Sequence, residues 1–343
     1  MGYPSNGASS FTLQITLLVL EEFRRRVRSG TLMFFVWSAY MMADATVIYV
    51  LGHMSVISRS PEHQLVAFWA PFLLLHLGGQ DNITAYAIED NQLWLRHLQT
   101  LAVQVAAAAY VLYESSIITG GQTSLRWATI LMSLVGAVKY GERVLALWCA
   151  SRSATRRNYG TYAEQLNVPK DAKAFKDALD TERLMRHAQE LLHIPKSLLK
   201  GSASDAAMPG PSFKEERLYK VVEMQLSLMH DIFYTKTQII HSNLYGLCIR
   251  TILTVTTATS LVLFHRLVRD DDGKDMEGYN RVDMAVTYVL LVGAVVLEAL
   301  SLLRAAFSCW TFYYRDDWSF NTCNVSLSLI VLLSRLLVRA VAW

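Results

Sequence analysis

Long apolar segments separated by charged stretches dominate the sequence. A helix that crosses a bilayer needs about 20 mostly apolar residues, and five segments reach that length: 31–52, 98–118, 125–149, 243–265 and 284–304. Two others are weaker candidates, because 65–77 is short and contains Pro71 whereas 325–343 carries Arg335 and Arg339. The pattern predicts an all-α, polytopic transmembrane helical bundle of about six spans. The last segment is either a seventh span or an interfacial helix.

A long charged insertion, residues 151–242, separates the fourth span from the fifth. It contains 14 Lys and Arg residues and a comparable number of acids. Apolar residues at helical spacing predict amphipathic helices over 180–199 and 213–236, the second continuing into the fifth span. On that second helix, one face is expected to carry Leu218, Val221, Val222, Met229, Ile232 and Phe233. The chain then divides into an N-terminal segment (1–30), a four-span half (31–150), this insertion and a C-terminal part (243–343).

Basic residues in short loops favour the cytosolic side of a membrane. A cluster of arginines precedes the first span, and the insertion is rich in lysine and arginine, so both are expected in the cytosol. That requires an even number of crossings between them, and 65–77 must therefore cross despite its length. The first apolar run, 11–20, is too short to span and is predicted to be an interfacial or partly inserted helix in a cytosolic N-terminal segment.

Composition narrows the function classes. Hydrophobic residues make up 52% of the 343 residues and charged residues 18%, against about 25% charged in soluble domains. The net charge of +3 is too small to indicate a nucleic-acid partner. Four isolated cysteines and the lack of phosphate-loop, hydrolase or zinc-protease motifs predict no metal, no cofactor and no enzyme activity. The expected partners are the lipid bilayer and proteins that bind the cytosolic face.

Several ionisable residues lie inside the apolar segments, where an unpaired charge is costly. They are Asp44, His76, Lys139, Glu142, Arg143, Arg250 and Glu298. Counting about 1.5 Å per helical residue, we expect Asp44 beside Lys139, and Glu298 beside Arg250 or Arg143. Such pairs either hold helices together or line a polar pathway. Alternatively, Arg250 and Arg143 extend to the interface.

The segment 68–98 is a polar, acidic and aromatic loop held between two spans, FWAPFLLLHLGGQDNITAYAIEDNQLWLRHL. It resembles the signature of a plant membrane-protein family catalogued as domain of unknown function 4220. Similar stretches follow in the same order, at 37–44, 138–147, 221–236 and 281–305. On these stretches the chain is identified as a member of that family.

The resemblance implies a multi-pass plant membrane protein with no established biochemical activity. Many members are similar in carrying a second cytosolic module after the last membrane segment, and we expect this chain to lack it. The resemblance also singles out a candidate functional loop, expected on the cytosolic side, with the residues His76, Gly78, Gly79, Asp81, Asn82, Thr84, Tyr86, Glu89 and Asp90.

Three functions are open. The first is a membrane scaffold or signalling component that binds partners through its cytosolic loops. The second is a transporter or channel for an ion or small solute that uses the buried charges. The third is a membrane-embedded enzyme with Asp81, Glu89, Asp90 and His97 at the cytosolic rim, although these residues match no known metal-ligand spacing. The lack of catalytic motifs and the amphipathic insertion favour the first.

Overall fold

The computed structural model describes residues 3–27, 29–57, 64–115, 117–118, 122–155, 188, 192, 195, 215–241, 244–270 and 281–306. These residues form helices and turns and include no strand. The helices are α1 (Tyr3–Arg26), α2 (Gly30–Ile57), α3 (Gln64–Ala67), α4 (Ala70–Gly78), the 3-10 helix η2 (Ile88–Leu93), α5 (Trp94–Glu114), α6 (Thr123–Thr155), α9 (Glu215–Tyr234), α10 (Thr237–His241), α11 (Leu244–Asp270) and α12 (Arg281–Ala306). The all-α prediction is confirmed, and each of the five predicted spans falls on a long helix.

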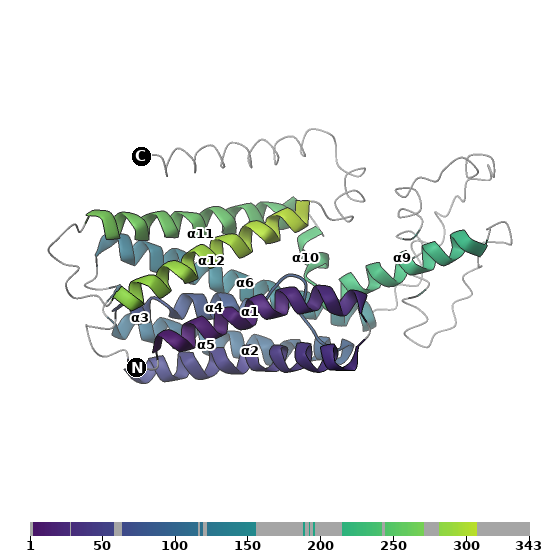
Figure 1. The fold of residues 1–343 in the computed structure, drawn as a ribbon, viewed down its shortest axis with the longest axis horizontal. Coiled ribbons are helices and arrows are strands. Elements are labelled where there is room, and N and C mark those ends of the chain that lie inside the picture. The colour runs from purple at the N-terminus through teal and green to yellow at the C-terminus, as the bar shows by residue number, and fades with distance from the viewer. Residues whose placement is uncertain are drawn as a thin grey trace, which may run out of the picture.

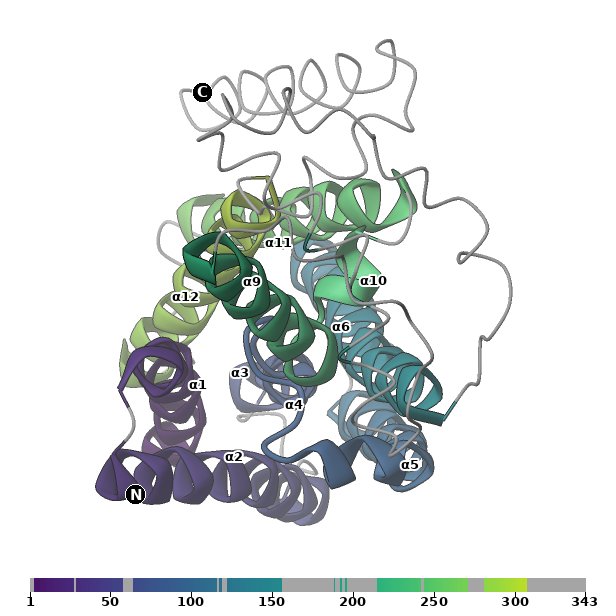
Figure 2. The ribbon, with the colours of Figure 1, turned by 90° about the vertical axis from the view of Figure 1, so that its right-hand side faces the viewer.

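The long helices form a bundle with a roughly common axis, and α9 extends from one end of it (Figure 1). We call this the α9 end. Seen along the axis, α1, α2, α5, α6, α11 and α12 surround α3 and α4 (Figure 2). All nine residues of α4 are buried, because neighbouring helices cover every side of it. Pro71 lies in the first turn of α4, where its missing N–H breaks no helical hydrogen bond.

Three of the described helices are long and apolar enough to cross a membrane: Gly30–Ser55, Cys248–Arg269 and Arg281–Ala305. The segment Leu65–Gly78 is also apolar but shorter. Large apolar side chains cover the outside of the bundle as well, and Phe34 on α2 is 60% exposed. Such a surface fits lipid rather than water, so the fold is that of a membrane protein.

The helix α1 is longer than the interfacial or partly inserted helix predicted at 11–20, and it packs within the bundle. It runs alongside α2 in the bundle, and Leu17 packs with Val36, Ala39 and Tyr40 of α2. Gly293 of α12 faces the ring of Phe11, where a Cβ would collide with that ring. Ser10 and Gln14 interrupt the apolar surface of α1, but both are bound by His76 of α4, and the Leu18 carbonyl accepts from Asn82 in the loop that follows α4. The helix therefore belongs to the bundle despite its mixed composition.

Two glycines allow α4 and α6 to lie very close together. A Cβ on Gly78 of α4 would lie 2.9 Å from the backbone carbonyl carbon of Lys139. A Cβ on Gly136 of α6 would lie 2.8 Å from the carbonyl oxygen of Pro71. Gly78, which the sequence placed in the candidate loop, therefore has a packing role at the end of α4.

The helix α9 confirms the predicted amphipathic helix, with two differences. Val221, Met229, Ile232 and Phe233 are buried as expected, but Val222 is 43% exposed. The helix also ends at Tyr234 and does not continue into the fifth span, because α10 and a turn come between α9 and α11. Most of the insertion, including most of the predicted helix 180–199, and the terminal segment 325–343 lie outside the described residues.

Candidate functional site

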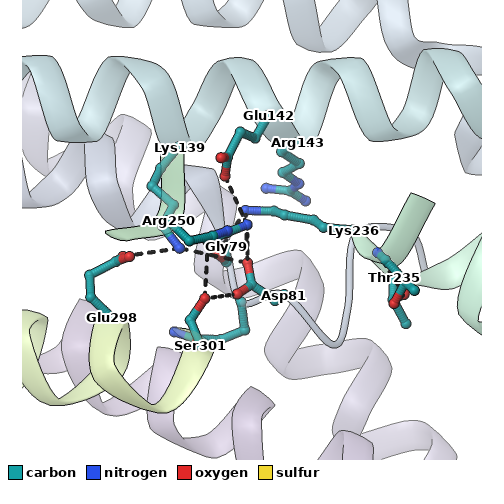
Figure 3. A network of polar contacts seen from close by, with 12 residues as sticks. Gly79, Asp81, Lys139, Glu142, Arg143, Thr235, Lys236, Arg250, Glu298 and Ser301 are labelled. Atoms are coloured by element: carbon teal, nitrogen blue, oxygen red, sulfur yellow. Dashed lines mark hydrogen bonds and ion pairs between the residues drawn. The ribbon is translucent and has the colours of Figure 1, made fainter. Parts of the chain in front are cut away.

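A buried ionic cluster lies near the α9 end of the bundle, where five segments meet (Figure 3). The loop after α4 contributes Asp81, and the turn between α9 and α10 contributes Lys236. The surrounding helices contribute Lys139 and Glu142 from α6, Arg250 from α11, and Glu298 and Ser301 from α12. Three acids and three bases thus occupy one cluster, which is neutral as a whole when all six are ionised.

Asp81 is the centre of the cluster. Its Oδ1 lies 2.8 Å from Nη2 of Arg250 and 3.6 Å from each ammonium of Lys139 and Lys236. Its Oδ2 accepts a hydrogen bond from Ser301. Burial favours the neutral acid, but the three cations outweigh it and hold the pKa of Asp81 well below its usual range. The carboxylate therefore stays ionised and connects three helices to the α9–α10 turn.

The two other acids, Glu298 and Glu142, each pair with one of the cations that contact Asp81. Glu298 lies 3.0 Å from the ammonium of Lys139, and Glu142 lies 2.9 Å from Nη2 of Arg250. Arg250 also donates to the Ser301 hydroxyl at 3.1 Å, and its side chain is 1% exposed. A buried cation is tolerated only when it is paired in this way.

Asp44 and Arg143 form a separate pair between α2 and α6. The guanidinium binds both carboxylate oxygens, at 2.7 and 3.0 Å, and also donates to the carbonyl of Leu77 at 2.8 Å. The predicted pairing of Asp44 with Lys139 is therefore wrong, and Glu298 pairs with Lys139 rather than with Arg250 or Arg143. Counting depth along the spans failed because the loop brings Asp81 into the bundle, where it attracts Lys139 and Arg250.

Replacing Asp44 with asparagine is expected to lower the free energy of unfolding by about 2 kcal/mol. The change leaves the Arg143 guanidinium, 3% exposed, without its carboxylate. Thermal unfolding in detergent, followed by tryptophan fluorescence, measures the loss. Adding Arg143→Met should recover part of the stability, because no unpaired cation is then left. If Asp44→Asn leaves stability unchanged, the pair has no structural role.

The candidate loop of residues 79–90 is packed against the bundle rather than open. Gly79 ends α4 with a φ of 66°, a conformation that favours glycine. Thr84 is 1% exposed, and its N–H donates to the carbonyl of Tyr234 at 2.8 Å. Asp90 accepts from the N–H groups of Tyr86 and Ala87, which fixes the turn before η2. Glu89 is exposed.

The helix α1 supplies partners for the end of α4 and the loop. Ser10 hydrogen-bonds Nδ1 of His76 at 2.9 Å, and Gln14 donates to the His76 carbonyl at 2.9 Å. Asn82 donates to the carbonyl of Leu18 at 3.1 Å. His76 therefore has a structural partner, and the described residues contain no group of three His, Cys, Asp or Glu that could hold a metal ion.

Two members of the cluster were not among the residues that the sequence singled out. Lys236 is one of many basic residues in the charged insertion, and Ser301 is a common residue in an apolar helix. Only one feature of the sequence could have pointed to Lys236 and Ser301: each lies within a stretch that resembles the family, 221–236 or 281–305. Contact between them and Asp81 depends on how the loop folds back, which local sequence does not encode.

A family model described as a domain of unknown function (DUF4220) matches residues 37–343. The chain belongs to this family. The match contains the whole ionic cluster as well as the Asp44–Arg143 pair, whereas α1, including Ser10 and Gln14, precedes it. No curated protein and no solved structure matches the chain.

Proposed function

We propose that this DUF4220 protein is a multi-pass membrane scaffold or signalling component that binds partner proteins through the α9 side of the bundle. One observation carries the proposal. The helix α9 buries one face against the chain itself and leaves a second apolar face exposed. That second face consists of Tyr219, Val222 and Leu226, at 72%, 43% and 59% exposure. Their spacing of three and four residues is that of an amphipathic helix bound in a groove.

The ionic cluster favours this proposal over transport. Each charge in the cluster has an oppositely charged neighbour. On the side away from α9 the core is apolar, with Leu51, Phe72 and Met132 at most 1% exposed. Charges that neutralise one another beside a packed apolar core hold the helices together. A transporter or channel for an ion or small solute is the second candidate, because ionisable residues of this density inside a membrane bundle are otherwise rare.

The proposal includes an orientation. The chain passes from α1 to α2 at the α9 end (Figure 1), and the arginines of positions 24–28 fall at this point in the sequence. Because basic loops favour the cytosol, the α9 end is proposed to face it, with α3 and α4 together forming the short crossing that an even number of crossings between α2 and the insertion requires. The start of α1 lies at the opposite end of the bundle (Figure 1). It is accordingly proposed to face away from the cytosol, contrary to the expected cytosolic N-terminus.

Replacing Tyr219, Val222 and Leu226 together with serine is expected to reduce partner capture at least about tenfold. The variant lacks the three apolar side chains whose burial would stabilise the complex. Photo-cross-linking from a benzophenone residue at position 223 in native membranes measures the capture.

The matched control for this experiment is Lys220→Ser. Lys220 is exposed on the same helix without belonging to the apolar face, so this variant should capture partners like the wild type. Equal capture by the triple serine variant and the wild type would contradict the proposed binding face. A flux of ions or solutes through reconstituted vesicles that is lost in Lys139→Met would favour the transport alternative.

A further inference from the structure

The junction between α9 and α10 (Tyr234–Thr237) holds α9 to the bundle through the candidate loop. The N–H of Thr84 donates to the carbonyl of Tyr234 at 2.8 Å, and the N–H of Lys236 donates to the carbonyl of Asp81 at 3.0 Å. Asn91 adds a side-chain hydrogen bond to the carbonyl of Phe233 at 3.0 Å. Three hydrogen bonds therefore define a closed state of the junction, and all three are lost if α9 and α10 separate from the loop and η2.

Lys236 is enclosed when the junction is closed. Its side chain is 0% exposed, and its ammonium lies 3.4 Å from the carbonyl oxygen of Gly79 and 3.6 Å from Oδ1 of Asp81. Asp81 is shared with Arg250 and Lys139, so Lys236 has no carboxylate of its own. The enclosed ammonium is thus weakly compensated, whereas water would solvate it fully if the junction opened.

We propose that the junction is an acid-sensitive switch, which releases α9 and α10 from the loop when the cytosol becomes more acidic. The inference concerns regulation of the helix that carries the proposed binding face, and it rests on that proposed function for its biological meaning. The groups that face the junction come from every element around it: Asp81 from the loop, Lys139 and Glu142 from α6, Asp231 from α9, His241 from α10, Arg250 from α11 and Glu298 from α12.

The direction of the switch follows from two bases that bind a proton less readily in the closed state than in the open state. Burial lowers the pKa of Lys236 from 10.5 to about 7, although Asp81 opposes the shift. Burial also lowers the pKa of His241 from 6.5 to about 4. The open state therefore binds more protons than the closed state, between pH 10.5 and 7 for Lys236 and between pH 6.5 and 4 for His241. Acidification through either window favours opening.

Hydrogen exchange tests this switch even when opening is rare. The amides of Thr84 and Lys236 exchange only when the junction opens, so their protection factors report its equilibrium. When the pH falls from about 8 to about 5.5, each base is expected to raise the equilibrium constant for opening about tenfold, and both together about 100-fold. Protection factors, corrected for the intrinsic pH dependence of exchange, should fall by that ratio. Buried amides of α6 should keep theirs.

The double variant Lys236→Met and His241→Leu should abolish the fall, and His241→Leu alone should leave about a tenfold change. The matched control is His53→Leu, an exposed histidine on α2, which should respond like the wild type. Unchanged protection in the wild type, or the same fall in a folded double variant, would overturn the switch. If the double variant does not fold, the single variant decides. Exchange requires no partner, so its outcome is independent of whether the apolar face of α9 binds a protein.

Discussion

Replacing Asp81 with asparagine is expected to lower the free energy of unfolding by about 3–5 kcal/mol. Its carboxylate neutralises the ammonium groups of Lys139 and Lys236 and the guanidinium of Arg250. The neutral amide would leave this group of cations with too little negative charge in a buried setting. Thermal unfolding of the purified protein in detergent, monitored by tryptophan fluorescence, measures the loss.

Glu89→Gln is the matched control, because Glu89 is an exposed acid in the segment that follows. The control should change stability by less than about 0.5 kcal/mol. Adding Lys236→Met to Asp81→Asn should restore part of the loss, since one uncompensated cation is removed. An Asp81→Asn protein as stable as the control would show that the cluster does not depend on this carboxylate.

Replacing Gly136 with alanine is expected to destabilise the protein by about 2 kcal/mol. The new Cβ would lie 2.8 Å from the carbonyl oxygen of Pro71 and 3.0 Å from the backbone nitrogen of Leu75. Both atoms belong to the backbone of α4, which cannot move away because neighbouring helices enclose it. The same thermal unfolding measurement applies.

Gly141→Ala on the same helix is the control, because this change is not expected to destabilise the protein. A Cβ at Gly141 meets no atom within 4 Å, and alanine is favoured over glycine in a helix by about 1 kcal/mol. Gly141→Ala should therefore leave the protein equally or more stable. If both alanine variants behave alike, α4 and α6 do not require the close contact at Gly136.

The length of the apolar runs was sufficient to predict where the long helices α2, α5, α6, α11 and α12 lie. The segments 31–52 and 284–304 correspond to α2 and α12, because an apolar run long enough to cross a bilayer has one stable backbone conformation. The break between α9 and α11 was not predictable in this way. No glycine or proline marks Lys236, and the chain turns there because its N–H binds the carbonyl of Asp81, a residue distant in sequence.

Most residues of the candidate site were predicted, except Lys236 and Ser301, but their pairing was not. Each carboxylate, lysine and arginine that the sequence singled out inside the apolar segments has an oppositely charged partner, as the cost of burial requires. The identity of the partners within the ionic cluster depends on the loop after α4, which inserts Asp81 between α6, α11 and α12. Depth along a straight helix contains no information about a loop that re-enters the bundle.

The enclosure of α4 has a consequence for the order of assembly. Of the long helices around α4, α1 and α2 precede it in the chain, whereas α5, α6, α11 and α12 are synthesised later. A ribosome therefore releases α4 before most of its surroundings exist. The segment must wait in lipid or beside the insertion machinery until α6 arrives and Gly136 can lie against Pro71. Biogenesis of this protein is thus expected to include a partly assembled stage in which a short central helix is still exposed.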